Sequence, residues 1–66
     1  MEQGSVKWFN EIKGYGVILR DNGGEIFVHH AAIIAGGLHT LLEGQRVQYA
    51  ANRGLKGLQA ENVQQV

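Results

Sequence analysis

The sequence predicts a small all-β protein, a five-stranded antiparallel Greek-key barrel of the oligonucleotide/oligosaccharide-binding (OB) type. Three observations lead to this prediction. Five short runs carry the alternation, or the β-branched and aromatic residues, that strands favour. Ten glycines without any proline suit tight turns and strongly bent strands. Five short strands with no substantial helix would leave exposed edges, and in a chain of 66 residues closure into a barrel removes them.

The first half of the chain is predicted to form three consecutive strands. The runs SVKWFN, YGVILR and EIFVHH are rich in β-forming residues, and they cover residues 5–10, 15–20 and 25–30. Asn22-Gly23 lies between the second and third runs and is a strong hairpin signal, because both residues tolerate a positive φ. The short separations predict an antiparallel meander.

The second half is more varied. It is expected to form one helical turn, a loop, a fourth strand, a tight turn and a fifth strand, at residues 31–34, 38–44, 46–52, 53–57 and 58–66. The run Ala35-Gly36-Gly37 would end the helical turn. In the fourth strand Val47, Tyr49 and Ala51 alternate, so they are predicted to share one face.

Length and composition indicate one domain that spans residues 1–66. A chain this short buries roughly 60% of the surface that its unfolded form exposes, so its core is small. The sequence has no cysteine, no apolar run of membrane-spanning length and no apolar signal segment, which predicts a cytoplasmic protein. Six basic and six acidic residues give zero net charge, so nucleic-acid binding would depend on local lysines rather than on an overall basic excess.

Strand parity divides the side chains of the first half between two faces. An aliphatic core set falls on one face and consists of Ile18, Ile26 and Val28. The opposite face carries three rings and one valine, at Tyr15, Val17, Phe27 and His29. In the first strand, a β-bulge is needed if Val6 is buried and Trp8 lies outside.

The aromatic residues allow two interpretations. Aromatic side chains dominate protein cores, so Trp8, Tyr15 and Phe27 could simply be buried. Against this, their parity opposes the aliphatic set, glycines flank Tyr15, and Lys7 and Lys13 lie close by in the sequence. Rings interleaved with lysines are typical of single-strand binding, in which bases stack on the rings and ammonium groups meet phosphates.

Motif order and spacing add a family resemblance. KWFN at 7–10, KGYGVI at 13–18 and IFVHH at 26–30 resemble bacterial cold-shock proteins, and the last two correspond to the two ribonucleoprotein motifs of that family. The resemblance covers the whole chain and includes TLLEGQRV at 40–47 and GLQAENV at 57–63. It implies a single cold-shock domain, an OB-type barrel that binds single-stranded RNA and DNA and acts as an RNA chaperone.

The resemblance also implies which residues contact nucleic acid. Matching positions, together with places where this chain departs from the family, give a candidate surface of Lys7, Trp8, Lys13, Tyr15, Val17, Phe27, His29, His30, Leu38 and Lys56. Val17, His30 and Leu38 stand where the family usually has aromatic residues. Since stacking is worth roughly 1–3 kcal/mol per base, the missing rings predict weak to moderate binding.

Other functions are weighed against this one. The main alternative is a protein-interaction or self-associating module on the same barrel, motivated by the zero net charge and the missing rings. A monomer is expected, although strand exchange through the long connection after the third strand would give a dimer. No catalytic pair, nucleophile or phosphate loop is evident, so no enzymatic activity and no cofactor are expected. His29 and His30 adjoin, but neighbours on a regular strand point to opposite faces, so no metal site is predicted.

Overall fold

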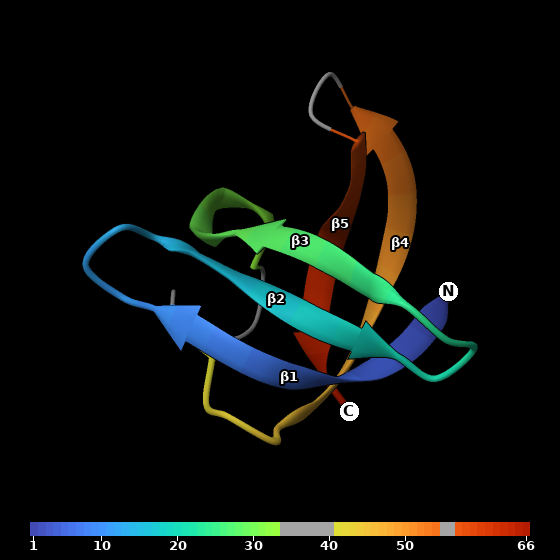
Figure 1. Ribbon diagram of the computed structural model, residues 1–66, viewed down its shortest axis with the longest axis horizontal. Coiled ribbons are helices and arrows are strands. Elements are labelled where there is room, and N and C mark those ends of the chain that lie inside the picture. Colours follow the sequence, from blue (N-terminus) through green and yellow to red (C-terminus); the bar gives the residue numbers. More distant parts are fainter. Residues whose placement is uncertain (34–40, 55–56) are drawn as a thin grey trace.

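The described chain is built of five strands that close into a barrel (Figure 1). The computed structural model describes residues 1–33, 41–54 and 57–66. Its elements are β1 (Glu2–Asn10), β2 (Tyr15–Arg20), β3 (Glu25–His29), the 3₁₀ turn η1 (His30–Ala32), β4 (Arg46–Gly54) and β5 (Gly57–Gln65). The order around the barrel is β1-β2-β3-β5-β4, which confirms the predicted five-stranded OB-type barrel. No helix among the described residues is long and apolar enough to cross a membrane.

Strand pairing follows the predicted meander and then closes the barrel. The β1–β2 and β2–β3 pairs are antiparallel, as are β1–β4 and β4–β5. The pairing between β3 and β5 is parallel, with Phe27 opposite Gln59 and Val28 opposite Ala60. Figure 1 shows β5 running behind β3 at this seam. The parallel seam joins two halves of the chain that no local turn connects.

Several element boundaries differ from the sequence prediction. β1 begins at Glu2 rather than residue 5, because Glu2 to Ser5 pair with β4. The helical turn falls at His30–Ala32, one residue earlier than predicted, and Ile34 lies outside the described residues. β4 extends to Gly54, into the predicted turn, of which residues 55–56 are not described. In the β2–β3 turn, Gly23 and Gly24 have positive φ values of 101° and 87°, whereas Asn22 does not share this conformation.

The core lies on the inward face of all five strands. Its buried aliphatic side chains include the predicted set of Ile18, Ile26 and Val28. Val47 and Tyr49 of β4 are fully buried, and Ala51 packs against the same cluster, so the predicted parity of β4 is confirmed. Burying a side chain of this size stabilises the fold by roughly 1.5–3 kcal/mol. A small barrel therefore depends on each of these residues.

A β-bulge in β1 reverses the parity of that strand. Val6 pairs with Ile18 and Trp8 pairs with Val17, so Lys7 is the extra residue between them. The predicted bulge is thereby confirmed: Val6 is 2% exposed and Trp8 is 37% exposed. Close packing of β2 against the bulged strand requires a glycine, because a Cβ at Gly16 would overlap the Trp8 carbonyl oxygen.

Two arginine–carboxylate pairs connect the strands at the edge of the barrel. Arg20 donates two hydrogen bonds to Glu2, at 2.9 and 3.0 Å, and Arg46 donates two to Asp21, at 2.8 and 2.6 Å. These hydrogen bonds lower the pKa of Glu2 and the pKa of Asp21 below their ordinary values. Burial raises the pKa of Tyr49, whose hydroxyl donates to Glu2 at 3.3 Å.

Candidate nucleic-acid interface

The outward face of β1, β2, β3 and β5 carries two rows of side chains. Residues opposite each other on paired strands point to the same side of a sheet. The pairing therefore aligns a first row of Trp8, Val17, Phe27 and Gln59, and a second row of Asn10, Tyr15 and His29. We call these two rows the ring face. It lies outside the barrel, because the residues that alternate with these rows form the core.

The rings of this face are open to solvent rather than packed in the core. Phe27 is 52% exposed and Trp8 is 37% exposed. The Trp8 and Tyr15 rings meet edge to face, with centroids 5.6 Å apart and planes inclined by 76°. Such a contact fixes the orientation of two rings while leaving part of their surface free. The interpretation of these aromatic residues as core residues is therefore wrong.

Val17 lies on the ring face but is covered there. It pairs with Trp8 on one side and Phe27 on the other, which confirms the face predicted for it. Its side chain is only 6% exposed, and it does not belong to the core cluster. Val17 therefore lies buried between two exposed rings, and little of its own surface is accessible to a ligand.

The two adjacent histidines lie together rather than on opposite faces. Their ring centroids are 4.3 Å apart, with planes inclined by 37°. The prediction of opposite faces is wrong, because β3 ends at His29 and the backbone turns into η1 at His30. His29 Nδ1 accepts a hydrogen bond from the Ala31 N–H at 3.2 Å, which holds its ring. In the described ranges, no three His, Asp or Glu residues form a group that could hold a metal ion.

His30 is positioned by the β1–β2 loop. Its backbone N–H donates to the Gly14 carbonyl at 2.8 Å. A Cβ at Gly14 would fall 2.5 Å from the Cδ2 atom of His30, so the imidazole lies directly over this glycine. Gly14 also has a positive φ of 75°, which few other residues adopt. The ring of His30 thereby extends the ring face beyond Tyr15 and His29.

The lysines beside the ring face differ in how they are held. Lys7 Nζ forms an ion pair with Glu25 Oε2 at 2.6 Å, and both side chains are about half exposed. Lys13 lies in the β1–β2 loop, where its backbone N–H donates to Asn10 Oδ1 at 2.9 Å. Its ammonium group makes no ion pair with any described residue. Leu38 and Lys56, the remaining predicted contact residues, lie outside the described residues.

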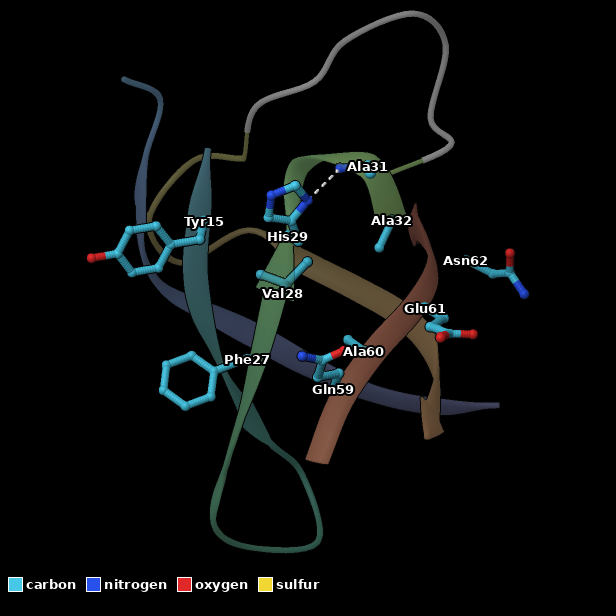
Figure 2. Close-up of a pocket in the computed structure, with 10 residues that line it drawn as sticks. All are labelled: Tyr15, Phe27, Val28, His29, Ala31, Ala32, Gln59, Ala60, Glu61 and Asn62. Atoms are coloured by element: carbon cyan, nitrogen blue, oxygen red, sulfur yellow. Dashed lines mark hydrogen bonds between the residues drawn. The ribbon is translucent and has the colours of Figure 1, made fainter. Parts of the chain in front are cut away.

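A groove of about 610 Å³ continues the ring face across the seam between β3 and β5 (Figure 2). Its rings come from Tyr15, Phe27 and His29, and its polar groups from Gln59, Glu61 and Asn62. The backbone of β5 bulges here: Ala60 and Val63 are both buried, so Glu61 and Asn62 both point outward. Asn62 adopts a left-handed backbone with a φ of 53°, which asparagine tolerates better than most residues.

The polar side of this groove is absent from the predicted contact residues. Sequence parity places Gln59 and Glu61 on one face of the fifth strand. That signal does not say which strand lies beside them, and the partner, β3, is about thirty residues away along the chain. Gln59, Glu61 and Asn62 therefore enter the site through tertiary pairing alone.

A closed OB-type barrel with exposed rings and flanking lysines is the architecture of a single-strand nucleic-acid-binding protein. Comparisons with known proteins agree with this class. Residues 2–66 match the family model described as the "'Cold-shock' DNA-binding domain". The chain belongs to this family, as the motif resemblance predicted.

Relatives of similar length carry the match over the whole chain. The chain is 54% identical to the "Cold shock-like protein CspA" of Stigmatella aurantiaca, with 100% of the chain and 98% of that protein covered. It is 53% identical to the "Cold shock protein CspC" of Bacillus subtilis, with 97% of each covered. Among solved structures, "drosophila Unr CSD456" superposes with a TM-score of 0.80 at 18% identity. That match covers 98% of this chain and 26% of the Drosophila chain, and it shows the fold alone.

Proposed function

We propose that this protein binds single-stranded RNA and DNA on the ring face and acts as an RNA chaperone. One observation carries the proposal: Trp8, Tyr15, Phe27 and His29 project from one outward face with no core role. Unpaired bases offer a flat surface to such rings, whereas bases within a duplex are already stacked. Family membership supports the same function.

The chaperone activity needs no energy source. A protein that binds only unpaired strands shifts the pairing equilibrium toward them by mass action. Each stacked base contributes roughly 1–3 kcal/mol, comparable with one weak base-pair step. A few exposed rings therefore suffice to melt marginal RNA structure while leaving stable helices intact.

The charges of the site favour stacking over phosphate attraction. The chain has zero net charge, and Lys7 is already paired with Glu25. A shallow dependence of affinity on salt follows, because each neutralised phosphate of a single strand contributes a log–log slope of only about −0.7.

We further propose a cytoplasmic, non-enzymatic monomer without a cofactor. The self-associating alternative is less well supported. It would use the same exposed rings for contacts between protein chains, whereas the family to which this chain belongs is one of nucleic-acid-binding domains.

Trp8 provides the assay. It is the only tryptophan, so its fluorescence reports stacking on the ring face without any label. We expect oligothymidine and mixed-sequence single-stranded RNA to quench it at low salt, and Phe27→Ala to weaken binding by about tenfold. Leu42→Ala is the matched control, since Leu42 is 69% exposed outside the ring face.

Two results would refute the proposed function. One is the absence of quenching by either oligonucleotide at low salt. The other is unchanged affinity in a Phe27→Ala variant whose circular dichroism shows a folded barrel. Loss of affinity in both Phe27→Ala and Leu42→Ala would point to a general effect on folding. Such an effect is excluded if both variants have the same thermal midpoint as the native protein.

A further inference from the structure

The groove between β3 and β5 has two chemically different walls. Phe27 and His29 of β3 supply rings, whereas Gln59 and Glu61 of β5 supply an amide and a carboxylate. The two strands are parallel, with Phe27 opposite Gln59 and Val28 opposite Ala60. His29 and Glu61 are the next residues along β3 and β5, and both line the groove. Figure 2 shows Tyr15 and Phe27 on one side of the groove, Glu61 and Asn62 on the other, and Gln59 between them.

The carboxylate of Glu61 is oriented by a neighbour. Asn52 of β4 donates from Nδ2 to Glu61 Oε2 at 2.7 Å. Oε1 accepts no hydrogen bond from any described residue, so it is free to accept one from a ligand. An ionised carboxylate can only accept hydrogen bonds, and it repels phosphate oxygens and carbonyl oxygens alike. A ligand group that fits here must therefore present N–H donors.

Charges on the two flanks of the ring face set the direction of a bound strand. Lys13, whose ammonium group makes no ion pair with any described residue, lies in the β1–β2 loop, at one flank. Glu61 lies on β5, at the other flank. Phosphates are attracted to the first and repelled by the second, so the backbone lies toward β1 and the edges of the stacked bases point toward β5.

We propose that this groove reads the edge of one unpaired base and prefers a base with an exocyclic amino group, with Glu61 as the acceptor. This inference rests on the proposed function. Cytosine and uracil make the distinction clear, because cytosine carries an amino group at the position where uracil carries a carbonyl oxygen. Carboxylate side chains accept hydrogen bonds from the cytosine amino group in nucleic-acid complexes. The carbonyl of uracil would face the same carboxylate without a hydrogen bond.

The test compares oligodeoxycytidine with oligodeoxyuridine of equal length, at neutral pH and low salt, by quenching of Trp8. These two ligands have the same ring size and backbone, so the ratio of their dissociation constants isolates the base edge. We expect the native protein to favour oligodeoxycytidine and Glu61→Ala to reduce that preference by about five- to tenfold. Removal of a negative charge strengthens binding of both ligands, and this effect cancels in the ratio.

Glu43→Ala is the matched control, because Glu43 is exposed and does not line the groove. It removes the same charge and should leave the ratio unchanged. Glu61→Gln is a second variant that retains an acceptor for Asn52, and its amide should also lower the preference because it donates to uracil as well as accepting from cytosine.

An unchanged ratio in both Glu61 variants overturns the inference, while continued binding of both ligands leaves the proposed function standing. An equal loss of preference in Glu43→Ala also overturns it, because the effect would then be one of overall charge. If neither ligand quenches Trp8 in the native protein, the proposed function itself has failed.

Discussion

Substitution of Glu25 tests how the ion pair with Lys7 controls nucleic-acid binding. The Lys7 ammonium and the Glu25 carboxylate are 2.6 Å apart, and the two side chains are 49% and 50% exposed. To meet a phosphate, Lys7 must exchange this partner for another anion. The exchange leaves the Glu25 carboxylate exposed beside the bound strand, so little net charge is neutralised.

The magnitude follows from the exposure of the pair. An exposed ion pair is worth about 0.2–1 kcal/mol, so breaking it costs binding a factor of about five at most. In Glu25→Gln, Lys7 is free to neutralise a phosphate and release its counterion. We expect affinity at low salt to rise by about two- to fivefold, and the log–log salt slope to become steeper by about 0.7.

The assay is Trp8 quenching by oligothymidine over a series of salt concentrations. Glu43→Gln makes the same change of net charge outside the ring face, and it should alter the slope far less. In a double variant, Lys7→Gln should cancel the gain from Glu25→Gln, since the gain acts through that lysine. A fall in affinity in Glu25→Gln would refute the reasoning and assign Glu25 a direct contact with the ligand. A salt slope equal to that of the native protein would also refute it, because Lys7 would then have gained no phosphate.

Two further predictions concern the ring face and the edge of the barrel. Val17→Phe should tighten binding of single strands by about tenfold, because a ring larger than the buried valine must extend outward between Trp8 and Phe27; unchanged affinity in the folded variant would contradict this. The thermal midpoint should fall as the pH drops below about 4. The pKa values of Glu2 and Asp21 are lowered in the folded protein, so their ionised carboxylates stabilise the fold at any pH above their ordinary pKa values. This stabilisation is lost when the carboxylates become protonated. Arg46→Gln removes the hydrogen bonds that lower the pKa of Asp21, so its midpoint should fall less between pH 6 and pH 3; an equal fall would exclude this mechanism.

Features encoded by neighbouring residues were predictable from the sequence. The meander follows from three runs of β-formers and a glycine-containing turn, and both of its strand pairs are antiparallel as predicted. The bulge at Lys7 could be deduced because strand parity placed Val6 and Trp8 on one face, although their chemistry suits opposite faces. Most of the ring face follows from the same alternation, since a period of two is a property of the strand itself.

Features that depend on distant pairing or on the end of an element were not predictable. The partner of β5 is β3, and nothing local to Gln59 or Glu61 identifies that strand. The stacking of His29 on His30 depends on where β3 stops, which is the least certain part of any assignment from sequence. Parity placed Val17 on the correct face, but whether neighbouring rings cover it is a matter of packing in three dimensions.

The neutral charge of the chain explains why base contacts, rather than phosphates, should determine what it binds. In the part of the chain that the structure describes, three cations are held in ion pairs: Lys7, Arg20 and Arg46. Long-range attraction of a nucleic-acid backbone is correspondingly weak, and so is the part of the affinity that salt removes. The remaining free energy comes from stacking, which every base can provide, and from the polar wall of the groove, which differs between bases. A basic binder of the same fold gains affinity from the phosphates of any strand, so a smaller share of its total binding free energy distinguishes one base from another. In this protein the edge contact at Glu61 is a larger fraction of the total, and base composition should outweigh ionic strength in setting its affinity.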